Sequence, residues 1–551
     1  MSAQETDPNG SLTSTDAGAP PKPFKPTMSF VLAYASLMML CLAVALDATT
    51  LSVALPVMST DLSGTALQAF WSGTGFLLAS SVFQPVVASF SSIFGRSYLI
   101  YLTSLFFAIG SLVAALAKSF SVVIIGRAVQ GAGGGGLLAL SEVVVTDLVP
   151  LAERGKYFSI LSAVWSVGTV AGPLIGAGFA QDVTWRWIFW MNLPIIAVGV
   201  VMVFFFLKQE RIPGGVVGKV KRFDFVGAFL FVVGSTSFLF GVSAGGVMYD
   251  WESWQTLVSI LVGAAVMIVC GLWEVMFAER FGTEPLINRG IFNNWSIISV
   301  DIQAVLHGAI LWSLLYFLIL YYQAIKLYSP VTSAVAALPE TLTVAPAAVV
   351  VGIASAIMGR YRWALWSGWA ITILGTGLLH LLDRHSTVPQ WIFLNLPVGI
   401  GTGMVFPASA LAIQAACSPR LNADAAAFFS FLRTFGQSLG VAVSGTVFQN
   451  AFRNQLEDMP EFAPRAGELS REATMVVGLI KGMPDGEPKE KLMDAYNEGL
   501  RILWIALTAL AGVAFLLSLT VRGYTLQQEH VSKQKLVATQ KAADEEAAEK
   551  K

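Results

Sequence analysis

Ser166-Val-Gly-Thr-Val-Ala-Gly-Pro-Leu-Ile-Gly-Ala-Gly-Phe-Ala180 is an uncharged stretch of the chain in which glycines are spaced four residues apart. On a helix, Gly168, Gly172 and Gly176 form one smooth stripe along which a second helix can approach closely. Pro173 removes a backbone donor and bends the helix. Such a helix is poor in water but is tolerated in lipid, where backbone groups are hydrogen-bonded internally. The pattern predicts a bent, closely packed membrane helix that can rock against a neighbour.

The composition agrees with a membrane protein. Of the 551 residues, 55% are hydrophobic and 13% are charged, whereas soluble proteins carry about 25% charge. The mean hydropathy is +0.67. The net charge of -1 does not indicate a nucleic-acid partner. The three cysteines and four scattered histidines have neither a disulfide framework nor the spacing of a metal site, so we expect no metal and no cofactor.

Apolar segments recur along the chain, and each is long enough to cross about 30 Å of hydrocarbon. We expect an all-α membrane protein with about fourteen spans at 30–55, 70–88, 98–115, 122–143, 158–180, 187–207, 225–243, 257–276, 296–322, 331–358, 363–382, 391–416, 427–448 and 502–521. An even number of spans places both termini on the same side of the membrane.

Basic residues in the short loops indicate which side that is, because cytoplasmic loops are enriched in Lys and Arg. With the N-terminus in the cytoplasm, thirteen basic residues lie inside and four outside: Arg96, Arg154, Lys156, Lys208, Arg211, Lys219, Lys221, Arg222, Arg280, Arg289, Arg360, Arg362 and Arg420 against Lys118, Arg186, Lys326 and Arg384. We therefore expect both termini in the cytoplasm.

This count gives an expected domain organisation. We expect a disordered cytoplasmic tail at 1–28, a six-helix half at 29–207, a basic cytoplasmic linker at 208–224, two extra spans at 225–276, a cytoplasmic loop at 277–295, a second six-helix half at 296–521 with a long, partly helical external loop at 453–498, and a cytoplasmic tail at 522–551.

Polar residues inside spans are costly and are the first candidates for function. Asp47 and Thr50 share a face of the first span, where Asp47 is either a protonatable group facing a cavity or a structural carboxylate. In the fourth span, Arg127 and Gln130 share a face with Gly131 and Gly134. An interior guanidinium there would tune the pKa of a nearby acid, unless it only forms an architectural ion pair.

Other polar residues are weaker candidates. Glu142 and Asp147 end the fourth span and could simply reach the membrane interface. Asp301 could also be interfacial, and we expect His307 to be a hydrogen-bonded interior residue. Two features of the second half stand out: Glu340 lies in a span kinked by proline, and Arg433 and Gln437 repeat the Arg/Gly pattern of the fourth span.

Two classes of nucleotide-dependent protein are not favoured. The run 131–136 matches a dinucleotide-binding fingerprint by letters, but it lies within a span and lacks a strand–turn–helix context. A phosphate-binding Gly-Lys-[Ser/Thr] loop does not occur in the sequence, which argues against an ATP-driven pump. We also find no clustered nucleophiles or facing acid–base pairs, so we do not expect an enzyme.

Four stretches together carry a resemblance to a known family. They are Leu46-Asp47 through Ala54-Leu55-Pro56, Phe94-Gly95-Arg96, Arg127-Ala-Val-Gln130-Gly131-Ala-Gly133, and Gly168…Gly172-Pro173…Gly176 followed by Trp185-Arg-Trp-Ile-Phe-Trp-Met-Asn-Leu-Pro194. Over residues 30–525 the chain resembles the major facilitator superfamily, and within it the fungal fourteen-spanner drug:proton antiporters. One motif departs from the family pattern, because Ser92 stands where an acid is usual and Ser97 replaces a base. The usual acid forms a latch at the cytoplasmic side, and a neutral serine weakens it.

The resemblance implies a fold and a mechanism. It implies two six-helix halves made of inverted repeats, with a substrate cavity between them at mid-membrane and alternating access by rocking. The two extra spans would be inserted between the halves, and the glycine stripe at 168–176 would be a hinge or seam between them.

The function implied is proton-coupled efflux of a hydrophobic small molecule, such as a fungal secondary metabolite, a toxin or a drug. Asp47 or Glu340 would carry the proton, and Arg127 would set its pKa. We expect a location in the plasma membrane, with a vacuolar or vesicle membrane as the alternative, and no required oligomer. Proton-coupled import of a siderophore or nutrient, and a non-transporting membrane sensor, are alternatives.

Overall fold

The computed structural model describes residues 26–536 except 65, 211, 247, 472, 529, 532–533 and 535. The expected tail at 1–28 and the end of the expected tail at 522–551 therefore lie largely outside the described residues. The α-helices are α1 (Met28–Asp61), α2 (Ala66–Phe94), α3 (Arg96–Ala115), α4 (Phe120–Leu148), α5 (Leu151–Gly178), α6 (Trp187–Trp190), α7 (Asn192–Phe206), α8 (Val216–Arg222), α9 (Phe225–Ala244), α10 (Trp254–Met276), α11 (Trp295–Ala324), α12 (Pro330–Ala336), α13 (Leu338–Met358), α14 (Arg362–Leu378), α15 (Val388–Ala416), α16 (Asn422–Glu457), α17 (Ala466–Arg471), α18 (Ala473–Gly482) and α19 (Glu487–Leu519).

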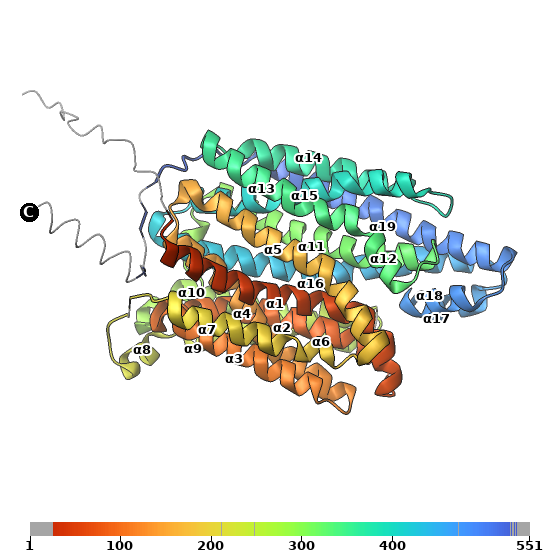
Figure 1. Ribbon diagram of the computed structural model, residues 1–551, viewed down its shortest axis with the longest axis horizontal. Coiled ribbons are helices and arrows are strands. Elements are labelled where there is room, and N and C mark those ends of the chain that lie inside the picture. The colour runs from red at the N-terminus through yellow and green to blue at the C-terminus, as the bar shows by residue number, and fades with distance from the viewer. Residues whose placement is uncertain are drawn as a thin grey trace, which may run out of the picture.

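The long helices lie side by side along the long axis of the molecule (Figure 1). We call the end where α1 begins and α19 finishes the tail end, and the end where α17 and α18 lie the loop end. Thirteen of the described helices are long and apolar enough to cross a membrane. The remaining expected span, 427–448, lies inside α16, a helix of 36 residues whose many small and polar residues lower its hydropathy. The predicted all-helical membrane fold is confirmed.

The helices form two groups. In the first group α1 packs against α5 and α7, and α4 packs against α2 and α3. In the second group α11 packs against α16, and α15 packs against α13 and α14. The pair α9–α10 packs on α2 and α16 through α9. Figure 1 shows the first group below the second, with α5 and α16 along the boundary between them.

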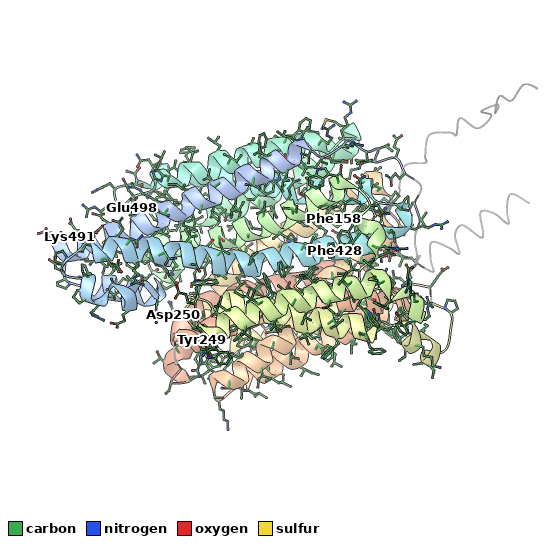
Figure 2. All side chains as sticks on the ribbon, turned by 180° about the vertical axis from the view of Figure 1, so that it is seen from behind. Phe158, Tyr249, Asp250, Phe428, Lys491 and Glu498 are labelled. Atoms are coloured by element: carbon green, nitrogen blue, oxygen red, sulfur yellow. The ribbon has the colours of Figure 1, made fainter. Side chains whose placement is uncertain are left out.

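The loop-end segment between α16 and α19 is partly helical, as expected. It contains α17 and α18, and Arg471 pairs with Asp250 of the α9–α10 connection at 2.7 Å. Figure 2 shows Asp250 at this end of the molecule, away from Phe158.

The glycine stripe of α5 packs against α1. A Cβ atom added at Gly168 would lie 2.4 Å from Cβ of Ala45, and one at Gly176 would lie 2.3 Å from the carbonyl oxygen of Thr50. The expectation that this stripe is a seam between the two halves was therefore wrong, because α1 and α5 belong to the same group. Its glycines instead allow two helices of the first group to touch backbone to backbone.

The contact between the groups at the tail end uses the other end of α5. A Cβ atom at Gly352 of α13 would lie 2.3 Å from the carbonyl oxygen of Gly155. The hydroxyl of Ser159 donates to the carbonyl oxygen of Ala348 at 2.6 Å, and Arg154 Nη1 donates to Gln414 Oε1 of α15 at 2.6 Å. The tail end is therefore closed along α5 and α13.

Candidate functional site

The first cluster of candidate residues surrounds Asp47 of α1, which is fully buried. Its Oδ2 accepts a hydrogen bond from Arg127 Nη1. Its Oδ1 accepts from Gln130 Nε2 at 2.7 Å and from Asn192 Nδ2 at 2.8 Å. The hydroxyl of Thr50 donates to the backbone carbonyl of Asp47 at 3.3 Å and not to its carboxylate. Both carboxylate oxygens of Asp47 are thus bonded within the first group.

Like Asp47, the side chain of Arg127 is fixed by several contacts. Its Nε donates to the carbonyl oxygen of Ser72 at 3.1 Å, and its guanidinium carbon lies 4.3 Å from the ring centroid of Phe76. Gly131 allows α4 to pack closely against α2 here, because a Cβ atom at this position would lie 2.3 Å from the carbonyl oxygen of Phe76. A buried ion pair with these extra bonds is costly to break. The geometry of this cluster is that of a structural anchor joining α1, α2, α4 and α7.

Asn192 is a member of this cluster that sequence reasoning missed. It is buried and begins α7. The available signal was its place near the end of the apolar and aromatic run 185–194, where a polar residue enters a span.

A second cluster surrounds a small cavity of about 50 Å³ between the groups, halfway along the helices. Its wall is formed by residues of α5, α11, α13, α15 and α16: Ser162, Trp165, Ser166, Thr169, His307, Leu311, Trp312, Leu315, Glu340, Thr341, Val344, Thr402, Phe406, Arg433 and Gln437. Four candidates from the sequence, His307, Glu340, Arg433 and Gln437, therefore meet here.

Glu340 differs from Asp47 in its surroundings. It is fully buried in the first turn of α13, and neither of its carboxylate oxygens has a hydrogen-bond partner among the described residues. His307 is hydrogen-bonded in the interior, as expected, with its Nε2 3.0 Å from the carbonyl oxygen of Thr402. An unpaired buried carboxylate is unfavourable in its charged form, so a proton or a hydrogen-bond donor would stabilise Glu340 in this position.

Arg433 connects this cavity to the first group. Its Nη2 lies 3.4 Å from Glu142 Oε1 of α4, and its guanidinium carbon lies 4.6 Å from the ring centroid of Phe406. Glu142 is 1% exposed, so the interpretation of Glu142 as a residue that reaches the membrane interface was wrong. Arg433 and Glu142 instead form an ion pair across the boundary between the groups.

Aromatic rings line the same cavity. The indole rings of Trp165 from α5 and Trp312 from α11 meet edge to face, with their centroids 6.4 Å apart. Each group contributes one ring, so this contact must change if the groups rock. Neither tryptophan was singled out from the sequence, because nothing local distinguishes a cavity-facing tryptophan from one that faces lipid.

Asp301 does not join this site. It is 6% exposed on α11 and lies outside the cavity wall, and neither carboxylate oxygen has a hydrogen-bond partner among the described residues. Asp301 is therefore buried among helices, and its interfacial position stays a prediction.

At the tail end, Gly95 and Arg96 of the expected loop motif join α2 to α3. Gly95 has a φ of +111°, a conformation that favours glycine. Arg96 Nε donates to Asp147 Oδ2 of α4 at 3.1 Å, and both side chains are buried. Asp147, like Glu142, is thus an interior ion-pair partner.

Ser92, at the position of the usual acid, donates its hydroxyl proton to the carbonyl of Ser89 at 2.7 Å.

The described residues contain no group of three or more His, Cys, Asp or Glu side chains placed to hold a metal ion. The central cavity brings together a carboxylate, a guanidinium, an imidazole and an amide between aromatic walls.

Comparisons with known proteins agree with this architecture. Residues 37–441 match the family model described as Major Facilitator Superfamily. The chain is similar to "MFS transporter L2" of Phoma sp. (strain ATCC 20986 / MF5453), at 47% identity over 526 residues, which cover 95% of this chain and 87% of that protein. It is similar to "Efflux pump FUS6" of Gibberella fujikuroi at 33% identity, with 92% of each chain covered, and to "MFS-type efflux pump LUC4" of Fusarium sp. at 32% identity, with 94% and 92% covered.

Two solved structures share the fold. One is a bacterial homologue of the human lysosomal transporter Spinster in an inward-facing, unoccupied conformation, with a TM-score of 0.56, 17% identity, and 90% of this chain and 98% of that chain covered. The other is the human organic anion transporter MFSD10, with a TM-score of 0.54, 15% identity, and 89% and 98% covered. From the match of the family model and the identity to these relatives, the chain belongs to the Major Facilitator Superfamily.

Proposed function

We propose that this protein exports a hydrophobic small molecule from the cytoplasm in exchange for protons. The protein would lie in the plasma membrane with both of its termini in the cytoplasm. The names of the FUS6 and LUC4 relatives as efflux pumps support the direction. The basic residues of the loops support the orientation. A fungal secondary metabolite, toxin or drug is the class of substrate we infer.

One observation carries the proton coupling: Glu340 is a fully buried carboxylate without a hydrogen-bond partner among the described residues, on the wall of a cavity between the two groups. A group that binds a proton when one side is open and releases it when the other side is open can drive exchange. Asp47, the other candidate, is less suited, because losing its charge would leave Arg127 unpaired. Arg127 would then anchor the first group and would not tune the proton carrier.

The cavity also supports binding of an apolar substrate. Trp165, Trp312 and Phe406 give it aromatic walls, and Arg433 and Gln437 add polar groups. At about 50 Å³ it is much smaller than the roughly 300–1,000 Å³ of ligand pockets. The substrate would therefore be held only when the groups separate at one end, as alternating access requires.

The available energy is sufficient for useful efflux. A membrane potential of about 100 mV supplies about 2.3 kcal/mol per charge, and one pH unit adds about 1.4 kcal/mol. Together these would sustain roughly a 500-fold gradient of a neutral substrate for each proton exchanged.

Transport driven by an imposed pH gradient in proteoliposomes tests the role of Glu340. We expect Glu340→Gln to abolish the dependence on the gradient and to retain substrate exchange without it, because a glutamine cannot carry the proton. Asp301→Asn is the matched control, since Asp301 is also buried without a partner among the described residues but lies outside the cavity. Loss of coupling in the Asp301 variant with normal coupling in the Glu340 variant would overturn the assignment.

A further inference from the structure

A second, larger cavity lies at the tail end, between α2, α4 and the start of α3 on one side and the start of α16 on the other, with the connector 284–291 forming a further part of its wall. Its volume is about 410 Å³. In Figure 2, Phe428, which lines this cavity, marks the part of α16 near the tail end. The cavity is separate from the central one, and the proposed transport cycle assigns it no role.

Arg96 lines this cavity and is incompletely bonded. Its side chain is 1% exposed. Nε bonds to Asp147 and Nη1 to the hydroxyl of Ser91 at 2.5 Å, but Nη2 has no partner among the described residues. A buried guanidinium nitrogen without an acceptor is unfavourable. Its free N–H groups are therefore placed to bind an acceptor inside the cavity.

The start of α16 lines the same cavity through Leu421, Ala423 and Asp424. The helix has 36 residues, and Leu421 at its N-cap provides no capping side chain. The N-terminus of a long helix carries a partial positive charge and favours an anion. A guanidinium of the first group and a helix N-terminus of the second group thus border one cavity.

The other charges of the wall are mixed. Arg222 is paired with Glu284. Arg420 is exposed and adds a positive charge, and Asp424 in the first turn of α16 adds a negative one. Asp424 therefore limits the affinity of the cavity for an anion, and removing its charge should increase that affinity.

We propose that this cavity binds a phosphate group, free or on a lipid headgroup, between Arg96 and the N-terminus of α16. Phosphate oxygens match both the guanidinium fork and the N–H groups of a helix start. The volume of the cavity accommodates a group larger than inorganic phosphate. Because its two sides belong to different helix groups, the bound anion holds the tail end closed and slows its opening.

The thermal stability of the purified protein tests this site without transport. With inorganic phosphate, compared with chloride at equal ionic strength, we expect Tm to rise by about 1–3 °C. Ser92→Asp places a carboxylate on the cavity wall beside Arg96, so it should abolish the rise. Ser92→Asn, similar in size but neutral, should keep it. Asp424→Asn should increase the rise in Tm, because it removes a negative charge from the cavity wall.

Short-chain phosphatidic acid, added in a parallel titration, identifies the source of the anion. Saturation at much lower concentrations than inorganic phosphate assigns the site to a lipid headgroup, and the reverse assigns it to a soluble phosphate. No rise with either probe, or equal rises in the Ser92→Asp and Ser92→Asn variants, would overturn the proposal. If Ser92→Asp does not fold, the Asp424→Asn variant decides: a rise in Tm with phosphate equal to that of the wild type would overturn the proposal.

The alkylation rate of Cys417 gives a second readout. Cys417 is 5% exposed and follows the last residue of α15 at the tail end. We expect phosphate to slow its reaction with a maleimide severalfold in the wild type and not in Ser92→Asp. A rate that does not respond to phosphate in the wild type would contradict the closing effect.

Discussion

At the scale of single residues, two buried carboxylates illustrate how surroundings decide a role. Asp47 accepts hydrogen bonds from three side chains, whereas Glu340 accepts none from the described residues. A fully bonded carboxylate stabilises one charge state and one packing arrangement. An unbonded one on a cavity wall is free to exchange a proton or a ligand.

This contrast predicts different effects on stability. Asp47→Asn leaves Arg127 buried without its counter-charge, so we expect a loss of about 3–5 kcal/mol in the free energy of unfolding. Glu340→Gln removes no hydrogen bond between described residues and should leave stability within about 1 kcal/mol of the wild type. Thermal unfolding in detergent measures both. A stable Asp47→Asn protein beside an unstable Glu340→Gln protein would contradict the distinction.

A third carboxylate, Asp61 near the loop end, gives a prediction of pH dependence. Hydrogen bonds from Trp185 Nε1 and Arg186 Nη1, each 2.8 Å long, hold the pKa of Asp61 below its ordinary value. A lowered pKa in the folded state means that the contact stabilises the fold above the ordinary pKa of about 3.9. This contribution is lost as the pH falls through the lowered value.

We therefore expect the fluorescence of Trp185 to change with acid below about pH 4, because protonation of Asp61 weakens the indole hydrogen bond. The wild type minus Trp185→Phe difference spectrum isolates this residue. The transition should be absent in Asp61→Asn. A transition that persists in that variant would show that another group is titrating.

At the scale of elements, α5 has two faces with different tasks. Its glycine stripe packs against α1, and its first turns contact α13 and α15 of the other group. The first contact stabilises one group internally. The second must break whenever the tail end opens, so it belongs to the moving boundary.

The α1–α5 contact can be tested with a pair of variants on one helix. Gly176→Ala places a Cβ atom 2.3 Å from the carbonyl oxygen of Thr50, whereas Gly178→Ala meets nothing within 4 Å. We expect Gly176→Ala to cost about 1–3 kcal/mol through overpacking, and Gly178→Ala to be neutral or slightly stabilising. Equal melting temperatures for the two variants would show that α1 and α5 do not pack this closely.

Sequence reasoning succeeded at this scale where the signal is local. The length of the apolar segments indicated where the spans lie, and a spacing of four placed Arg433 and Gln437 on one helix face, where both reach the cavity. It failed where contacts join distant helices. Arg433 and Glu142 are 291 residues apart, and no local pattern shows that α16 faces α4. For the same reason the glycine stripe was assigned to the wrong neighbour.

At the scale of the whole molecule, the two groups pack along α5 with α13 and α15 and along α16 with α2 and α4, and polar contacts join them at particular points. Arg154 with Gln414 and Ser159 with Ala348 close the tail end, and Arg433 with Glu142 joins the groups at the centre. Arg154 appeared from the sequence only as one of the loop charges. In the folded molecule Arg154 is buried, and it donates to the carbonyl oxygens of Thr146 and Val149 at the end of α4. No local pattern in the sequence indicates these contacts.

The central claim is that substrate and protons move in opposite directions through the cavity at Glu340. The most direct measurement follows a pH-sensitive dye inside proteoliposomes while a panel of hydrophobic metabolites and antifungals is added. We predict that an active substrate moves protons against its own direction, and that Glu340→Gln abolishes this movement. Proton movement in the direction of the substrate would make the protein an importer, and substrate flux without proton movement would contradict coupling altogether.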